Sequence, residues 1–420
     1  MYGLVDCNNF FVSCERVFNP ALERRPVVVL SNNDGCVIAR SNEAKRLGIP
    51  MGCPAFQIKD HTDPRQVVQL SARHIVYSDL SHRIMAILGQ TVEGIEIYSV
   101  DEAFFRMPTD DVERGHEMMA ALVKRIRREV GVPVSIGFAP SRTLCKIAAE
   151  TAKKHPQIKD GVYWIIRPEA IDIMLRRTPI EDVWGVGRRL APQLKARGIT
   201  TAALLAALPP EVVRINYSVT LERTARELRG EDCLQPAPIS TSRKTIMNSR
   251  TFGTVLTERN DVRDAVLNFA ERCAKHLRDE HSVAAAVTAF VSGDRFREDL
   301  PYYSNDCRLR LSTPSSATNV IVHYAMLAFN NIFREGYGYR RAGVLVSDIS
   351  PDSGVQLNLF DKTDHGKQRE LMKAIDSIND NYGSRMVQLA PQADATARWR
   401  PLQSHTATAS HTLRFYTAMS

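Results

Sequence analysis

The chain has 420 residues with a formal net charge of +8, and 44% of its residues are hydrophobic. These values predict a globular protein of about two to four domains. A membrane-spanning protein is excluded because no apolar run is long enough to cross a bilayer. A secreted, disulfide-rich protein is not expected, because Asp6 lies where a signal peptide needs its apolar core and the eight cysteines include no C-x-x-C pair. We therefore expect free thiols and a cytoplasmic location.

Acidic residues end two predicted strands. The first strand begins at Tyr2 and ends at Asp6, with a helix directly beyond it, and a hairpin over residues 95–105 has Asp101 and Glu102 at its turn. Neighbouring side chains on a regular strand point to opposite faces, so both hairpin acids can reach one site only where the strand bends. Three such carboxylates suit two Mg²⁺ ions in phosphoryl transfer, with the free N–H groups of the helix near the phosphates. The alternative for the Asp-Glu pair is a solvated turn.

A small subdomain is predicted between these acids. It follows a strand over residues 26–30 and consists of small polar residues, a short strand that ends at Arg40 and a short helix. After the acid hairpin, an amphipathic helix over residues 113–130 and a strand over residues 132–138 continue the alternation. This order predicts an α/β or α+β core.

The next helix begins at Ser141 and is basic. Lys146 and Lys153 are seven positions apart and so share a face, which is most often a solvated face. If this helix leans over the acids, Lys153 would contact an incoming triphosphate. Residues 1–110 carry a net charge of −2, whereas residues 111–240 carry +6 and residues 241–420 carry +4. The basic later parts suit binding to a polyanion.

Two later segments also carry candidate contacts to a nucleic acid. In the helical stretch after residue 166, Gly185 and Gly187 permit a tight turn whose bare amides can approach a phosphate. A simple helix-capping turn is the alternative, and the adjacent Arg188 and Arg189 favour DNA backbone. From Ser240 a separate α+β domain is predicted, whose basic strand residues suit a sheet laid against duplex DNA; the predicted contacts are Lys244 and Arg250.

One apolar motif stands alone in the polar segment after Pro351. It comprises Gln356, Leu357, Asn358, Leu359 and Phe360. An exposed motif of this kind in a flexible tail predicts docking into a partner's pocket, and the alternative is an edge strand of the preceding domain.

With these features in place, the chain resembles the Y-family translesion DNA polymerases, and within them the UmuC branch, the catalytic subunit of bacterial DNA polymerase V. The resemblance covers residues 1 to about 360 and is carried by DCNNFF at 6–11, VVLSNNDGCVIAR at 28–40, YSVDEAF at 98–104 and DVWGVG at 182–187. It implies a multi-domain α+β fold shaped like a right hand. The implied parts are a palm (1–30 and 76–165), fingers (31–75), a helix-hairpin-helix thumb (166–239), a little finger (240–350) and a flexible C-terminal tail (351–420).

The resemblance also implies roles for individual residues. Asp6, Asp101 and Glu102 would bind two Mg²⁺ ions, with the backbone carbonyl of Cys7 as a further ligand. Phe11 would be a steric gate that excludes ribonucleotides, and Val37, Ile38 and Ala39 would form a small roof over the nascent base pair. The implied nucleotide-binding residues are Phe10, Phe11, Arg40, Asn42, Lys45 and Lys153.

The implied partners are primer-template DNA, dNTPs, the sliding clamp, a UmuD-type dimer and a RecA filament. Residues 356–360 resemble the pentapeptide with which bacterial polymerases dock on the clamp; the predicted contacts are Gln356, Leu357, Leu359 and Phe360. The last 60 or so residues differ from the usual ending of UmuC-like chains.

We therefore expect an error-prone translesion DNA polymerase of the SOS damage response. Two other hypotheses are a non-catalytic manager that binds DNA and the clamp, and another two-metal nucleotide enzyme such as a cyclase. The presence of all three carboxylates counts against the manager. The thumb glycines and the clamp-like peptide count against the cyclase.

Overall fold

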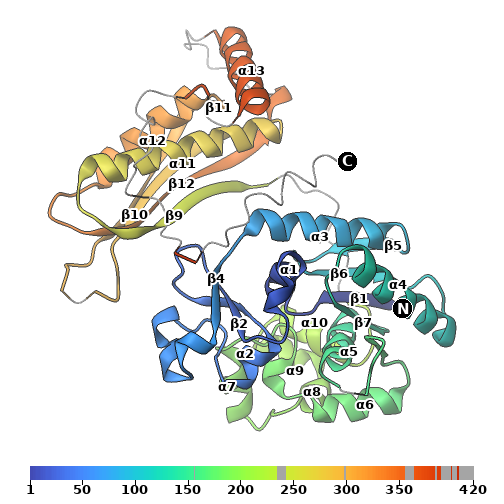
Figure 1. Ribbon diagram of the computed structural model, residues 1–420. Coiled ribbons are helices and arrows are strands. Elements are labelled where there is room, and N and C mark those ends of the chain that lie inside the picture. The colour runs from blue at the N-terminus through green and yellow to red at the C-terminus, as the bar shows by residue number, and fades with distance from the viewer. Residues whose placement is uncertain are drawn as a thin grey trace. The chain divides into compact units, whose positions relative to one another are not determined.

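The computed structural model describes residues 1–155, 157–233, 243–297, 299–354, 364–383, 386–388, 399 and 404–405. The chain forms two compact units, one of residues 1–238 with 405–420 and one of residues 239–404 (Figure 1). Each unit has its own β-sheet and its own hydrophobic core, so the fold is of the α+β class that we expected.

The first unit is built on a five-stranded sheet in the order β5-β6-β1-β7-β8 (Figure 1). The central strand β1 is antiparallel to both β6 and β7, and β7 is parallel to β8. Strands β1 and β7 are buried on both faces, which explains their continuous apolar sequence. The strands are β1 (Tyr2–Cys7), β5 (Glu93–Ile97), β6 (Glu102–Arg106), β7 (Val134–Ala139) and β8 (Val162–Trp164).

Helices pack on both faces of this sheet, and alternate residues of β1 face different helices. Val5 and Cys7 belong to the core that includes residues of α1, α3 and α4, whereas Tyr2 and Leu4 belong to the core that includes α5. Asp6 continues the second set and therefore lies on the α5 face. These helices are α1 (Phe10–Phe18), α3 (His74–Gly89), α4 (Val112–Glu129) and α5 (Arg142–Lys154).

Helix α5 lies very close to the sheet at Gly137 of β7. A Cβ atom on Gly137 would stand 2.2 Å from the backbone nitrogen of Ala149 and 2.6 Å from the carbonyl oxygen of Cys145. No side chain fits in this space. The glycine therefore lets α5 approach the sheet, and it brings the polar face of α5 to the ends of β1 and β6.

A three-stranded sheet in the order β3-β2-β4 forms the second part of this unit. It consists of β2 (Val27–Leu30), β3 (Val37–Arg40) and β4 (Val68–Ser71), with the short helix α2 (Asn42–Arg46). Strand β2 pairs with β3 and, in parallel, with β4. We had grouped residues 26–30 with the palm, but this pairing joins β2 to the small sheet.

The first unit continues with short helices that share a core with α5. They are α6 (Pro168–Arg177), α7 (Leu190–Ala196), α8 (Ala202–Ala206), α9 (Pro210–Asn216) and α10 (Val219–Leu228). Ser218 caps the first turn of α10 with its side chain, and Thr201 does the same for α8. The turn that precedes α7 contains Gly185, whose φ of +88° lies in the left-handed region that favours glycine.

The second unit is a four-stranded antiparallel sheet in the order β11-β10-β12-β9, covered on one face by two helices. Its strands are β9 (Thr245–Leu256), β10 (Ser282–Ser292), β11 (Ser304–Ser315) and β12 (Tyr339–Pro351), and its helices are α11 (Arg259–Asp279) and α12 (Thr318–Ile332). Ile246 and Phe252 of β9 are buried beneath the helices, whereas Met247 is 54% exposed. One face of the sheet is therefore open to solvent.

The segment after Pro351 is not wholly the flexible tail that we expected. Helix α13 (His365–Tyr382) packs on the second unit and buries Met372. Arg278 of α11 holds it with two hydrogen bonds to Asp376, of 2.6 and 2.8 Å. Residues 356–360, the predicted clamp-binding motif, lie outside the described residues.

Two predictions about the whole chain can be compared with the structure. All eight cysteines are free thiols, as expected. Among the described residues, no helix is both long enough and apolar enough to span a membrane.

Candidate active site

Asp6, Asp101 and Glu102 converge at the end of β1 and the start of β6. Asp6 lies directly opposite Glu102 in the antiparallel register, so the two side chains share the α5 face of the sheet. Asp101 precedes β6, and its carbonyl oxygen accepts a hydrogen bond of 2.9 Å from the backbone N–H of Cys7. The structure thus brings the three predicted carboxylates and Cys7 to one cavity, where all four line the wall.

Each of the three carboxylates is contacted by a lysine or by a hydroxyl group. Lys153 Nζ lies 2.7 Å from Asp6 Oδ1, and Lys146 Nζ lies 2.6 Å from Glu102 Oε2. The hydroxyl of Ser99 donates a hydrogen bond of 2.5 Å to Asp101 Oδ1. The two lysines belong to one face of α5, as their spacing predicts, and both point at acids.

Burial raises the pKa of the Asp6 carboxyl to about 6, although Lys153 favours its charged form. Burial alone would lower the pKa of Lys153, but Asp6 outweighs this effect and raises it. A buried carboxylate with a raised pKa is stabilised by any further cation, and carboxylate oxygens are the ligands that Mg²⁺ prefers. The donor set therefore fits Mg²⁺, although in the described part of the chain no three ligating side chains stand close enough together to hold a metal ion.

One cavity, which we name the β3 cavity, opens between the carboxylates and the small sheet. It has a volume of about 410 Å³. Ile38, Ala39 and Arg40 of β3 form one wall, and Phe10 and Phe11 of α1 form another. Lys45, Lys153 and the three acids also line it, so the cavity contains both positive and negative groups.

Asn9 organises the basic wall of the β3 cavity. Its side-chain oxygen accepts a hydrogen bond of 2.7 Å from Lys45 Nζ, and its side-chain nitrogen donates one of 3.1 Å to Asn42. Asn9 caps α1 in the left-handed conformation, with φ of 47°, which Asn tolerates better than most residues. Asn42 thus contacts the cavity wall through Asn9. Asn9 belongs to the sequence motif but was not among the predicted site residues.

The basic groups here are concentrated. Burial lowers the pKa of Lys45, and the charges of Lys153 and Arg40 lower it further. Arg40 is held in place because its Nη1 donates a hydrogen bond of 2.6 Å to the carbonyl oxygen of Ile49. Three cationic side chains close enough to lower the pKa of Lys45 create a site for a polyanion.

Phe11 is supported from behind by a buried polar cluster. Its ring stacks on Tyr77, with centroids 4.4 Å apart and an interplanar angle of 16°. The hydroxyl of Tyr77 donates a hydrogen bond of 2.7 Å to Glu15, which Arg73 also binds through two hydrogen bonds, one of them 2.9 Å long. The Glu15 side chain is only 2% exposed, so the cluster fixes the Phe11 ring. Sequence reasoning missed Glu15, although it lies one helical turn after Phe11.

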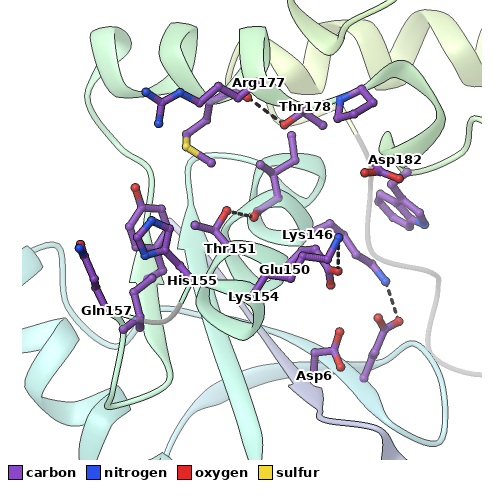
Figure 2. Close-up of a pocket in the computed structure, with 17 residues that line it drawn as sticks. Asp6, Lys146, Glu150, Thr151, Lys154, His155, Gln157, Arg177, Thr178 and Asp182 are labelled. Atoms are coloured by element: carbon purple, nitrogen blue, oxygen red, sulfur yellow. Dashed lines mark hydrogen bonds and ion pairs between the residues drawn. The ribbon is translucent and has the colours of Figure 1, made fainter. Parts of the chain in front are cut away.

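A second cavity, which we name the α6 cavity, opens on the other side of the carboxylates. Its volume is about 790 Å³. Figure 2 shows Asp6 at one end and Arg177 with Thr178 at the other, with side chains of α5 between them. Lys146 and Glu150 line it from α5, and Trp184 lines it from the turn before α7. Asp6 and Glu102 therefore line both cavities, whereas Asp101 lines the β3 cavity.

The glycine turn beside the α6 cavity leaves Arg188 and Arg189 exposed. Gly185 needs its glycine for a positive φ, but Gly187 does not have a positive φ and a Cβ there would meet nothing within 4 Å. The fold of the described residues thus gives no reason for glycine at 187. A close approach by a group outside the chain would give one.

The predicted basic residues of the second unit occupy different surroundings. Lys244 is exposed just before β9. Arg250 is half-buried, and it shares the strand parity of the buried Ile246 and Phe252, so it lies on the side of β9 that the helices cover. Arg341 of β12 pairs with Thr251 and therefore lies on the open face.

Comparison with known proteins gives matches along most of the chain. Residues 5–150 match the impB/mucB/samB family, residues 243–359 match the C-terminal domain of that family, and residues 168–199 match the HHH motif of the IMS family. Protein UmuC of Salmonella typhimurium is 40% identical over 93% of this chain and 93% of its own length. Protein MucB of Escherichia coli is 30% identical over 96% of this chain and 99% of its own length.

More distant matches are named DNA polymerases. DNA polymerase IV 2 of Bacillus subtilis is 29% identical over 90% of this chain and 91% of its own length. Among solved structures, a Y-family DNA polymerase chimera of Dbh and Dpo4 has a TM-score of 0.63 at 21% identity, and covers 83% of this chain and 99% of the chimera. At this identity, the likeness shows a shared fold.

Proposed function

Because this chain belongs to the impB/mucB/samB family and is a Y-family DNA polymerase of the UmuC type, we propose that it performs translesion DNA synthesis with two Mg²⁺ ions. The observation that carries this proposal is the position of the carboxylates. Asp6, Asp101 and Glu102 line the β3 cavity, and Asp6 and Glu102 also line the α6 cavity. A nucleotidyl transferase needs this arrangement, because its two substrates must meet at the metal ligands.

Asp6, Asp101 and Glu102 would hold the ions, with the carbonyl oxygen of Cys7 as a further ligand. When bound, two such ions favour ionisation of the primer 3′-hydroxyl and neutralise charge at the α-phosphate. The chain's own contribution is to fix the ligands. The cross-strand pairing holds Asp6 opposite Glu102, and the hydrogen bond from Cys7 N–H holds Asp101 beside them.

The β3 cavity would bind the incoming dNTP. Its concentrated basic groups, Arg40, Lys45 and Lys153, suit a triphosphate, with Asn42 supporting Lys45 through Asn9. The Phe11 ring, fixed by Tyr77, would collide with a ribose 2′-hydroxyl. Ile38 and Ala39 present a small apolar surface, which suits a roof over the nascent base pair that tolerates damaged templates.

The α6 cavity and its glycine turn would receive the primer end of the duplex. The bare Gly187 amide and the exposed Arg188 and Arg189 suit contacts to DNA phosphates. The second unit would contribute Lys244, and Arg341 lies on the open face, where a sheet can contact a duplex. Arg250, on the helix-covered side of β9, is not placed for such a contact. Contacts of this kind give affinity without sequence preference.

We also propose the partners and the setting that the UmuC resemblance implies. Residues Gln356, Leu357, Leu359 and Phe360 would dock on the sliding clamp, and a UmuD-type dimer and a RecA filament would activate the enzyme in the SOS damage response. A clamp tether would offset weak affinity for DNA by raising the local concentration. The chain would meet these partners in the cytoplasm.

The test is primer extension by the purified full-length chain with Mg²⁺ and dNTPs, on an undamaged template and on one with an abasic site. Extension past the lesion by the wild-type chain, and none by Asp101→Ala, would support the proposal. Asp101→Ala should still bind primer-template DNA, because it removes a metal ligand and not a phosphate contact. Retained extension by Asp101→Ala would overturn the site assignment.

A second arm separates the enzyme from its partners. If the wild-type chain binds DNA but does not extend it, the assay is repeated with a UmuD-type protein, an activated RecA filament and the clamp. Extension that appears only then would assign activation to those partners. No extension under any of these conditions would contradict a polymerase activity of this chain.

A further inference from the structure

Three aromatic rings surround the ammonium group of Lys146. The Nζ atom lies 4.7 Å from the ring centroid of Tyr98, 5.5 Å from that of Trp184 and 5.9 Å from that of Phe104. The same atom lies 2.6 Å from Glu102 Oε2. Aromatic faces attract a cation and limit its access to water, so these rings hold the lysine toward Glu102.

The rings come from two separate parts of the first unit. Tyr98 and Phe104 flank the turn of the β5-β6 hairpin that carries Asp101 and Glu102. Trp184 comes from the turn before α7, immediately before Gly185. The indole Nε1–H of Trp184 donates a hydrogen bond of 3.2 Å to the Tyr98 hydroxyl, and the two rings meet edge to face at 87°.

Lys153, the second lysine on this face of α5, has different surroundings. It lies 2.7 Å from Asp6 and 4.0 Å from Glu150, so it forms ion pairs with two acids. Lys146 instead combines one acid with the aromatic rings. The difference singles out Lys146 as a cation whose position depends on a residue of the glycine turn.

We propose that Trp184 is a positioning residue for nucleotidyl transfer, which acts by holding Lys146 against the carboxylate of Glu102. This inference rests on the proposed function. A charge-assisted hydrogen bond from Lys146 fixes one carboxylate oxygen of Glu102. It thereby also sets the direction in which the other carboxylate oxygen points. Trp184 thereby connects the turn that carries Gly185, Gly187 and the two arginines to the reacting centre.

The direct test is a double-mutant cycle on single-nucleotide addition with Trp184→Ala and Lys146→Met. Each single change should lower the maximal rate by about 10- to 100-fold, the usual effect of losing a group that orients a metal ligand. If Trp184 acts through Lys146, the double variant is no slower than Lys146→Met alone. Trp184→Phe keeps a ring over Lys146 and should recover most of the rate.

The affinity for primer-template DNA separates this role from a purely structural one. It should change by less than about threefold in every variant, because the glycines and arginines of the turn remain. Trp164→Phe is the matched control, since Trp164 packs on Phe138 at a ring distance of 6.4 Å, and it should keep the wild-type rate. Multiplicative rate losses in the double variant, or a loss confined to DNA affinity, would overturn the proposal.

A second measurement does not depend on catalysis. In a chain with Trp164→Phe and Trp399→Phe, Trp184 is the remaining tryptophan, and its fluorescence reports on Lys146. Glu102→Gln removes the anionic partner of Lys146 and should shift the emission, whereas Asp6→Asn, at the Lys153 pair, should not. Equal shifts, or none, would overturn the link even if the chain proves to be an active polymerase. If the emission shifts in Glu102→Gln and not in Asp6→Asn, but the chain adds no nucleotide, only the proposed function has failed.

Discussion

The β3 cavity and the α6 cavity share the carboxylates of Asp6 and Glu102 but are built from different contacts. Around the β3 cavity, Phe11 is fixed by stacking on Tyr77 and Lys45 by a hydrogen bond to Asn9. Around the α6 cavity, Lys146 is fixed by rings from the β5-β6 hairpin and from a turn 86 residues further along the chain. The first arrangement suits a small ligand that must be checked for shape. The second suits a long polymer whose binding reaches the reacting centre.

Helix α5 serves both cavities, so the largest effect should come from moving it. Gly137→Ala would place a Cβ atom 2.2 Å from the Ala149 nitrogen, and α5 would have to shift away from the sheet. We expect a loss of about 3 kcal/mol in the free energy of unfolding and loss of nucleotide addition. Thermal unfolding of the full chain measures the first effect. A Gly137→Ala chain with wild-type stability and activity would show that the close approach of α5 is unnecessary.

A change at Phe11 should affect the β3 cavity alone. Phe11→Ala removes the ring that faces the sugar, and we expect discrimination against ribonucleotides to fall by about 10- to 100-fold. The ratio of kcat/KM for dNTP to that for rNTP measures it. Tyr77→Phe keeps the stacked ring and is the control, with most of the discrimination retained. An unchanged sugar preference in Phe11→Ala would remove the gate from the account.

The smallest effects should come from the glycine turn beside the α6 cavity. Gly187→Ala should weaken DNA binding by about fivefold with no change in stability, since its Cβ would meet nothing within 4 Å. Gly185→Ala should instead cost about 1 kcal/mol of stability, because the φ of +88° strains any other residue. Titration of labelled primer-template and thermal unfolding distinguish the two. The reverse pattern would mean that Gly187 serves the fold.

Much of the active site could be predicted from the sequence because its parts are local. The strand that ends at Asp6, the hairpin that carries Asp101 and Glu102 and the common face of Lys146 and Lys153 follow from periodicity over a few residues. The structure brings these together as the pattern indicates. Phe11, Lys45 and Arg40 were predicted from a resemblance to a family, and they line the β3 cavity.

Long-range contacts could not be predicted from local patterns. Tyr77 stacks on Phe11 and is itself held by Glu15, 62 residues earlier in the chain, and Trp184 reaches Tyr98 across 86 residues. The parallel pairing of β2 with β4, which joins β2 to the small sheet, likewise left no local signal. Helix α13 was missed because a polar segment was expected to be flexible, whereas Arg278 anchors it through Asp376.

In the proposed function, the β3 cavity and the α6 cavity serve two different substrates. The most direct test is single-nucleotide addition by the wild-type chain, by Lys45→Ala and by a combined Arg188→Ala and Arg189→Ala variant, with dNTP and primer-template concentrations varied separately. We predict that Lys45→Ala raises the dNTP concentration for half-maximal rate by about tenfold, while DNA affinity is unchanged. The arginine variant should weaken DNA binding alone. If Lys45→Ala and the arginine variant each changed the affinities for dNTP and for DNA equally, the two cavities would not serve separate substrates.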